Sequence, residues 1–308
     1  MAIASDVTGI IGNTPVVRVS RFGVGGACPR GELLIKLESR NPGGSVKDRA
    51  ALYMIEDAER RGFLAPGGVI VEPTSGNTGV GLAMIAAARG YSLVLTMPDS
   101  MSVERQRLFS AYGARVVPTP GSKGMAGAVE RALELARENP GWFMPYQFEN
   151  EANPKAHEET TAREILRDLD GRLDAFVAGI GTGGSITGIG RVLKREIPRV
   201  LVIGVEPAES PVLGGGKPGP HRIQGIGAGF VPRVLDMGVL DEVMQVGSDQ
   251  AYASTRELAR TEGILAGISS GAAAWAAAEV ARRLGVGSRT LALLPDTGER
   301  YLSVEGLF

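Results

Sequence analysis

One lysine occupies a position where its charge opposes the local field of the backbone. Lys47 lies in the segment NPGGSVKDR (41–49), where a loop is predicted to become a helix. The first turn of a helix carries a partial positive charge and favours acidic side chains. A lysine there is either a solvated surface residue or a group placed for chemistry. Burial beside the positive helix end would lower its pKa, and a neutral amine can act as a nucleophile or a base.

Three glycine-rich turns follow predicted strands and open predicted helices. They are EPTSGNTG (72–79), GIGTGGSITG (179–188) and GISSGAA (267–273). In open α/β sheets, ligands bind where the strands run into such turns. The second turn adds the hydroxyls of Thr182 and Ser185 to closely approachable backbone N–H groups. This combination at a helix start suits a terminal phosphate monoester.

The second turn also matches a dinucleotide-binding pattern. GIGTGG (179–184) satisfies G-x-G-x-x-G, and Glu206 follows after about twenty residues, as the pattern requires. An NAD-dependent oxidoreductase with Glu206 on a ribose hydroxyl is therefore an alternative function. Two features disfavour it. The motif lies in the second half of the chain rather than in its first strand–helix unit, and hydroxyls stand among its glycines.

Short apolar runs alternate with helical patterns along the whole chain. Near-continuous apolar strands alternating with helices predict parallel sheets that are covered on both faces. Two irregular stretches, 140–155 and 210–232, interrupt this order, and we expect the first to join domains and the second to line a site. The predicted strands are 33–37, 69–72, 92–97, 114–118, 175–180, 200–205 and 290–295, and helical patterns stand out at 80–90, 125–139 and 188–198.

The composition excludes several classes of protein. The chain has 33 basic and 34 acidic residues, a net charge of −1 and no long charged run, which argues against nucleic acid or an anionic membrane as a partner. Cys28 is the only cysteine, and the two histidines fit no metal-ligand pattern, so we expect neither an internal disulfide nor a metal site. The sequence has no signal-peptide pattern and no apolar run long enough to cross a bilayer. We therefore expect a cytoplasmic protein.

Four motifs in this order resemble the O-acetylserine sulfhydrylase (cysteine synthase) family of tryptophan-synthase-β-like, or fold type II, pyridoxal phosphate enzymes. They are NPGGSVKDR, EPTSGNTG, GTGGS and GISSGAA, and the similarity extends from IIGNTPVVRV (10–19) to LLPDTGERYLS (293–303). The resemblance implies two parallel-sheet, three-layer α/β domains with the cofactor in the cleft between them. We expect a large cofactor-binding domain at 1–47 and 151–308, and a smaller, mobile substrate-binding domain at 48–150.

The resemblance also implies roles for individual residues. Lys47 would form a covalent imine with pyridoxal 5′-phosphate, and its freed amine would remove the α-proton of the substrate. Asn77 would bond the phenolic oxygen of the cofactor, and Ser269 would face the pyridine nitrogen. The implied phosphate-binding residues are Gly181, Thr182, Gly183, Gly184 and Ser185. The implied substrate-binding residues are Thr74, Ser75, Gly76, Thr78 and Gln147, together with Gly225 in a covering loop that begins at His221.

The implied reaction is loss of acetate from O-acetyl-L-serine through an aminoacrylate, followed by addition of sulfide to give L-cysteine. A neutral hydroxyl opposite the pyridine nitrogen gives a shallower electron sink than an aspartate, which favours prompt β-elimination. Related activities remain as alternatives: O-phosphoserine sulfhydrylase, cystathionine β-synthase, serine or threonine dehydratase, and a non-catalytic binding relative. A homodimer and a complex with serine acetyltransferase follow only from the resemblance.

Two residues depart from the family pattern, and three others are expected to have no part in the chemistry. Ser185 stands where threonine is usual, and Tyr146 stands where a second glutamine is common beside Gln147. His157 precedes an acidic helical stretch, and we expect it to be solvated. Cys28 lies in a glycine-rich turn, where we expect no catalytic role. Lys36 lies within a predicted strand, so we expect its replacement to leave the chemistry intact.

Overall fold

The computed structural model describes residues 3–23, 31–100 and 103–308, so Cys28 lies outside the described residues. The chain divides into two compact units. Unit 1 comprises Met1–Ile11 and Asn41–Ala156, and unit 2 comprises Gly12–Arg40 and His157–Phe308. Among the described residues that we expected in the larger domain from the sequence, 3–11, 41–47 and 151–156 belong to unit 1. Lys47 therefore lies in the same unit as the EPTSGNTG turn.

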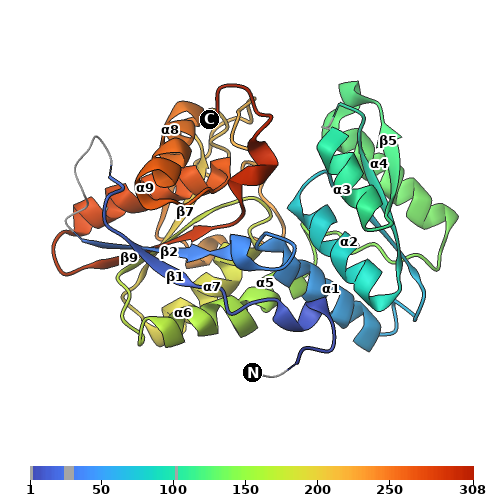
Figure 1. Ribbon diagram of the computed structural model, residues 1–308, viewed down its shortest axis with the longest axis horizontal. Helices are drawn as coiled ribbons and strands as arrows, with labels where there is room; N and C mark the ends of the chain where they lie inside the picture. Colours follow the sequence, from blue (N-terminus) through green and yellow to red (C-terminus); the bar gives the residue numbers. More distant parts are fainter. Residues whose placement is uncertain (1–2, 24–30, 101–102) are drawn as a thin grey trace. The chain divides into compact units, whose positions relative to one another are not determined.

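Unit 1 is built around a sheet of three parallel strands. The elements of this unit are η1 (Val7–Ile10), α1 (Lys47–Arg60), β3 (Val69–Pro73), α2 (Asn77–Arg89), β4 (Ser92–Pro98), α3 (Val103–Ala111), β5 (Arg115–Thr119), η4 (Gly121–Lys123), α4 (Gly124–Glu138) and α5 (Ala152–Ala156). Successive side chains of a strand point to opposite faces of the sheet. Ile70 accordingly joins a buried cluster with residues of α1 and α2, whereas Val71 packs with Ala132 and Leu135 of α4. Both faces of the sheet are thus covered by helices (Figure 1).

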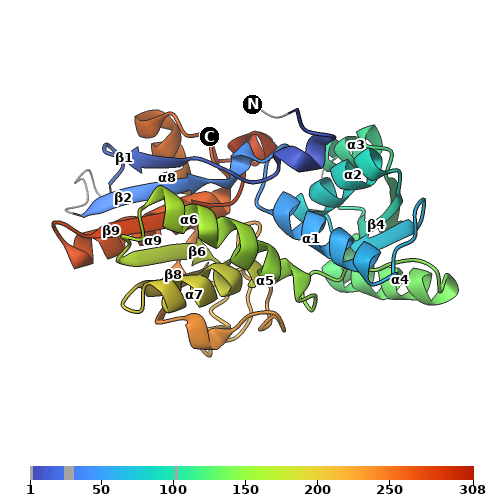
Figure 2. The same ribbon diagram turned by 90° about the horizontal axis from the view of Figure 1, so that it is seen from below.

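Unit 2 is built around a six-stranded sheet in which one strand is antiparallel. The elements are β1 (Val16–Val19), β2 (Glu32–Leu37), η3 (Glu38–Arg40), η5 (His157–Thr161), α6 (Ala162–Asp168), β6 (Ala175–Gly179), α7 (Gly184–Glu196), β7 (Leu201–Pro207), η6 (Met237–Val239), β8 (Glu242–Val246), α8 (Ser248–Glu257), η7 (Leu258–Glu262), α9 (Ile268–Leu284), β9 (Arg289–Leu294) and η8 (Gly298–Tyr301). The strand order is β1-β2-β9-β6-β7-β8, and every pair except β1-β2 is parallel. Helices α8 and α9 cover one face of this sheet, and α6 and α7 cover the other (Figures 1 and 2).

The predicted α/β class with largely parallel sheets is confirmed, and all seven predicted runs form strands. Two strands were not predicted: β1 and β8, the outermost strands of the six-stranded sheet. Each is short and carries polar side chains, such as Arg18 in β1 and Gln245 in β8. An edge strand is paired on one side only and need not read as a continuous apolar run.

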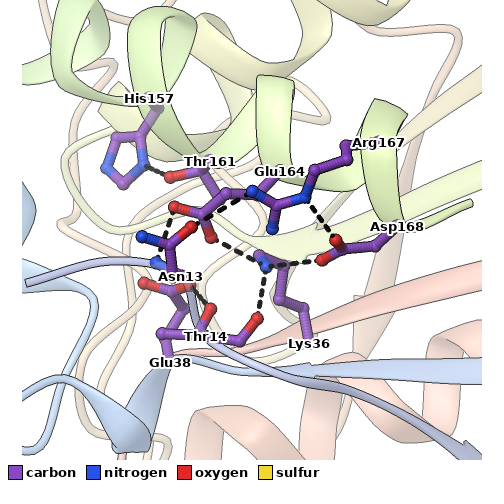
Figure 3. Close-up of polar contacts among 9 residues, drawn as sticks. All are labelled: Asn13, Thr14, Lys36, Glu38, His157, Thr161, Glu164, Arg167 and Asp168. Carbon is purple, nitrogen blue, oxygen red and sulfur yellow. Dashed lines mark hydrogen bonds and ion pairs between the residues drawn. The ribbon is translucent and has the colours of Figure 1, made fainter. Parts of the chain in front are cut away.

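A buried lysine joins the strands of unit 2 to α6 (Figure 3). The side chain of Lys36 is fully buried, and its Nζ lies 2.8 Å from the Thr14 carbonyl oxygen and 2.9 Å from Glu164 Oε2. Asp168 Oδ2 lies 3.7 Å away, and the other oxygen of Glu164 accepts the Asn13 N–H at 2.9 Å. A charge removed from water needs such partners. Lys36 therefore has a structural role, and its replacement is not a fold-neutral control.

Candidate active site

Lys47 is the first residue of α1 and is partly buried. Its backbone N–H donates to Ser45 Oγ at 3.2 Å. The next residue, Asp48, is fully buried, and its Oδ2 accepts the Gly43 N–H at 2.6 Å. The carboxylate of Asp48 also suits the positive end of the helix. These bonds fix the glycine-rich loop against the first turn of α1 and hold Lys47 at the predicted junction.

The turn at 74–78 connects β3 to α2. Gly76 is the N-cap of α2 and has no side chain that could bond the N–H groups of the first turn. Two bonds hold the turn. Arg105 Nη1 of α3 donates to the Ser75 carbonyl at 2.9 Å, and within the turn the Gly76 N–H donates to Thr74 Oγ1 at 3.2 Å. An uncapped helix start of this kind is suited to an anion such as a carboxylate.

Unit 1 brings two predicted substrate-binding residues into direct contact. Thr78 Oγ1 donates to Gln147 Oε1 at 2.6 Å, although the residues are 69 positions apart. Both side chains are buried. Helix α2 also lies close to the start of α1, because a Cβ on Gly81 would stand 3.1 Å from the Lys47 carbonyl oxygen. The turn at 74–78, Gln147 and the helix start at Lys47 thus belong to one packed region of unit 1.

The GIGTGG turn of unit 2 requires glycine at two positions. Gly183 is the N-cap of α7, with a left-handed φ of 87°, and a Cβ there would lie 2.7 Å from Leu235 Cβ. A Cβ on Gly181 would lie 2.4 Å from the Gly225 carbonyl oxygen. The N-cap Gly183 has no side chain to bond the first turn of α7, and the Gly184 N–H reaches Thr182 Oγ1 at 3.4 Å. The turn therefore presents backbone N–H groups with the hydroxyls of Thr182 and Ser185, and these donors fit a phosphate group.

Ser269, which is predicted to face the pyridine nitrogen of the cofactor, lies near this turn in unit 2. Ser269 lies in the first turn of α9 and is buried. Its Oγ lies 3.5 Å from the position of a Cβ built on Gly225, whose carbonyl oxygen packs against Gly181. Gly225 has a φ of 95°, which favours glycine. The phosphate turn, the predicted covering loop and Ser269 thus form a second cluster within unit 2.

The expectation that His157 is solvated is wrong. His157 is 1% exposed, and its ring joins two hydroxyls. Nδ1 lies 2.9 Å from Thr161 Oγ1, and Nε2 lies 3.0 Å from Ser185 Oγ. No local pattern in the sequence indicates this arrangement, because Ser185 is 28 positions away from the histidine. His157 therefore holds a hydroxyl that we expect to contact phosphate.

The dinucleotide alternative is not favoured. Glu206 is 1% exposed, and both carboxylate oxygens accept backbone N–H groups of the following loop. Oε2 accepts from Leu213 at 2.8 Å, and Oε1 accepts from Gly214 at 3.0 Å. The carboxylate that would bind a ribose hydroxyl thus has a structural role within its own loop.

Comparison with known proteins agrees with the cofactor-binding interpretation. Residues 7–296 match the family model described as "Pyridoxal-phosphate dependent enzyme". A curated cysteine synthase from Staphylococcus aureus (strain Mu50 / ATCC 700699) is 54% identical over 299 residues, which cover 97% of this chain and 95% of that protein.

Two solved structures show that the similarity extends to the fold. The cysteine synthase (OASS) of Entamoeba histolytica has a TM-score of 0.96 at 40% identity, covering 100% of this chain and 91% of that chain. An O-ureido-L-serine synthase has a TM-score of 0.95 at 48% identity, covering 100% of this chain and 96% of that chain. The comparisons thus include enzymes named for different products.

Proposed function

The chain belongs to the pyridoxal-phosphate dependent enzyme family, and we propose that it acts as a cysteine synthase. It converts O-acetyl-L-serine and sulfide to L-cysteine and acetate with pyridoxal 5′-phosphate as cofactor. The observation that carries this proposal is the contact between Thr78 and Gln147 beside the uncapped start of α2, in a chain 54% identical to a cysteine synthase over nearly its whole length. O-phosphoserine, cystathionine and NAD-dependent activities are not favoured.

The cluster in unit 1 and the cluster in unit 2 have different roles in binding the cofactor and the substrate. Bound pyridoxal phosphate supplies an electron sink for the bonds of the substrate's α-carbon. Lys47 holds the cofactor through its side-chain amine and, once freed, moves the α-proton. The turn at 181–185 binds the phosphate, Asn77 bonds the phenolic oxygen, and Ser269 faces the ring nitrogen. A neutral serine at this position does not stabilise a protonated ring as an aspartate would, which favours prompt loss of the leaving group.

Substrate binding depends on the start of α2. The α-carboxylate of O-acetylserine meets the N–H groups at 74–78, where the helix field favours an anion. Gln147 adds a side-chain amide next to Thr78. In unit 2, Gly225 lies in the loop whose backbone packs against Gly181 of the phosphate-binding turn.

Acetate release without sulfide tests this function. We expect the cofactor-loaded protein to release about one acetate per site when it is mixed with O-acetylserine alone, because departure of the leaving group precedes sulfide addition. Sulfide added afterwards should give cysteine, and steady-state double-reciprocal lines should be parallel. Acetate formation that requires sulfide, or turnover of O-phosphoserine in preference to O-acetylserine, would contradict the proposal.

Removing the imidazole of His157 tests its hold on Ser185. We expect His157→Phe to weaken binding of pyridoxal phosphate about 2–10-fold, the effect of one lost hydrogen bond. The measurement is a titration of the cofactor-free protein, followed by absorbance. Thr161→Val is the matched control, because it removes the hydroxyl bonded to the other ring nitrogen and leaves Ser185 in place. Unchanged cofactor binding in His157→Phe would contradict a role of the histidine in holding Ser185.

We propose a cytoplasmic location, a homodimer and a complex with serine acetyltransferase. Across the described ranges, the structure contains no helix that combines the length and the apolar character needed to cross a membrane. The single cysteine supports a reducing compartment such as the cytoplasm. A homodimer and a complex with serine acetyltransferase rest on the resemblance to the family.

A further inference from the structure

A buried carboxylate lies two residues before the turn at 74–78. Glu72 is the second-last residue of β3 and is 1% exposed. Its Oε2 accepts the Tyr146 N–H at 2.8 Å, and its Oε1 accepts the Gln147 N–H at 3.2 Å. A buried carboxylate is costly unless such donors compensate for the lost water. Glu72 therefore connects the strand that leads into the turn with the segment that carries Gln147.

The segment around Gln147 depends on these bonds for its path. The segment before Gln147 runs beside β3, because the Phe143 carbonyl accepts the Val71 N–H at 2.8 Å. Tyr146 then adopts a left-handed φ of 50°, a conformation that non-glycine residues rarely adopt. Tyr146 and Gln147 donate their N–H groups to Glu72, and these two bonds fix the path of the backbone where it turns away from β3. The unusual backbone conformation is thus maintained by a side chain of the neighbouring strand.

Gln147 is held at three points within unit 1. Glu72 accepts its N–H, Asn153 Nδ2 donates to its carbonyl oxygen at 3.0 Å, and Thr78 donates to its side-chain oxygen at 2.6 Å. The bond from Thr78 occupies Oε1, so the amide of Gln147 keeps two N–H donors on Nε2. The backbone position of Gln147 decides where these donors point.

We infer that Glu72 is a positioning residue for the substrate: it fixes the backbone of Tyr146 and Gln147 so that the Gln147 amide meets the α-carboxylate beside Thr78. This inference rests on the proposed function, in which the turn at 74–78 and Gln147 bind O-acetylserine. Glu72 itself is buried and acts only through the two N–H groups. Its effect should therefore appear in substrate affinity rather than in the chemical step.

The chemistry of the group explains why a carboxylate is present. An ionised carboxylate only accepts hydrogen bonds, so both oxygens match N–H donors. Burial raises the pKa of Glu72 to about 7, while the bonds from Tyr146 and Gln147 act in the opposite direction. A glutamine of nearly the same size would offer one oxygen and turn its NH₂ toward the second N–H. Glu72→Gln thus removes one acceptor while keeping the packing volume.

A double-mutant cycle on steady-state kinetics tests the inference. We expect Glu72→Gln to raise KM for O-acetylserine about tenfold with kcat unchanged, as for an interaction that serves binding alone. In the double variant with Gln147→Ala, the Glu72 change should add little, because its effect passes through Gln147. Effects on KM that multiply would overturn the inference.

A second buried glutamate provides the matched control. Glu206 has the same exposed fraction and also accepts two backbone N–H groups, at Leu213 and Gly214. Glu206→Gln therefore makes the same chemical change in the other unit. Its effect on KM should be small and should multiply with that of Gln147→Ala. If Glu206→Gln shows the same coupling to Gln147, a general loss of stability explains the result for Glu72.

Hydrogen exchange in the cofactor-free protein gives a readout that does not depend on activity. In the parent protein, the amides of Tyr146 and Gln147 should be protected, and Glu72→Gln should speed their exchange while the Val71 amide remains slow. Rapid exchange of both amides in the parent would overturn the inference even if the variant failed to fold. A parent protein that forms no cysteine, yet shows this protection, would contradict the proposed function and leave the hold on Gln147 supported.

Discussion

Lys47→Ala is expected to lower the rate of cysteine formation by more than the contribution of a general base alone, which is typically about 10²–10⁴-fold. The same amine holds the cofactor and removes the α-proton, so one substitution removes both functions. The cofactor should still bind without a covalent link, because the phosphate turn at 181–185 and Asn77 remain. Cysteine formation and the cofactor retained after gel filtration are the two measurements.

Lys123→Ala is the control for Lys47→Ala. The Lys123 side chain is 60% exposed and forms a 2.9 Å ion pair with Glu130. A solvent-exposed pair of this kind contributes little to stability, and we place no function on it. The control should keep the parental rate. If Lys47→Ala keeps more than a few per cent of that rate, Lys47 is a solvated lysine at a helix start.

Lys36→Met is expected to lower the free energy of unfolding by about 3–5 kcal/mol. The substitution removes the Lys36 cation from the buried carboxylate of Glu164, and removing one partner of a buried ion pair costs more than replacing both. Urea unfolding measures the change. The rate of cysteine formation at low temperature should stay close to that of the parent, because Lys36 belongs to the structural network of unit 2.

Removing both charges should restore part of this stability. In Lys36→Met/Glu164→Gln, the amide oxygen can still accept the Asn13 N–H, and no buried charge remains at Glu164. The double variant should therefore unfold at higher urea than Lys36→Met. If the single variant loses less than about 1 kcal/mol, as an exposed pair would, then the Lys36 ion pair does not stabilise the fold.

The sequence predicts strands well where burial on both sheet faces produces apolar runs. It predicts helix starts less well: the pattern at 188–198 begins after Gly184, where α7 starts. The first turns of α2 and α7 contain glycines, which have low helix propensity, so propensity places these starts too late. The same glycines are what allow the backbone to approach an anion. The same glycines thus weaken the prediction of a helix start and strengthen the prediction of an anion-binding site.

The partners of buried polar groups could not be predicted from local patterns. Lys36 reads as an ordinary strand residue, and its carboxylate partners come from α6, far along the chain. His157 and Glu72 likewise bond groups that only the folded chain brings near. Residue type and spacing identified the glycine-rich turns because each turn is local. They could not identify the side chains that hold those turns in place.

The strand order of unit 2 has a consequence for synthesis on the ribosome. β9 lies between β2 and β6 in space but is the last strand to be made. The strands and helices of unit 1 are all complete by Ala156, so its sheet can form while the rest of the chain is still emerging. The edges of β2 and β6 wait for β9, and at about 5–20 residues per second the interval between Leu37 and Arg289 is roughly 10–50 s. During that time these unpaired edges can pair with strands of other chains, so aggregation during synthesis is the main risk that this strand order creates.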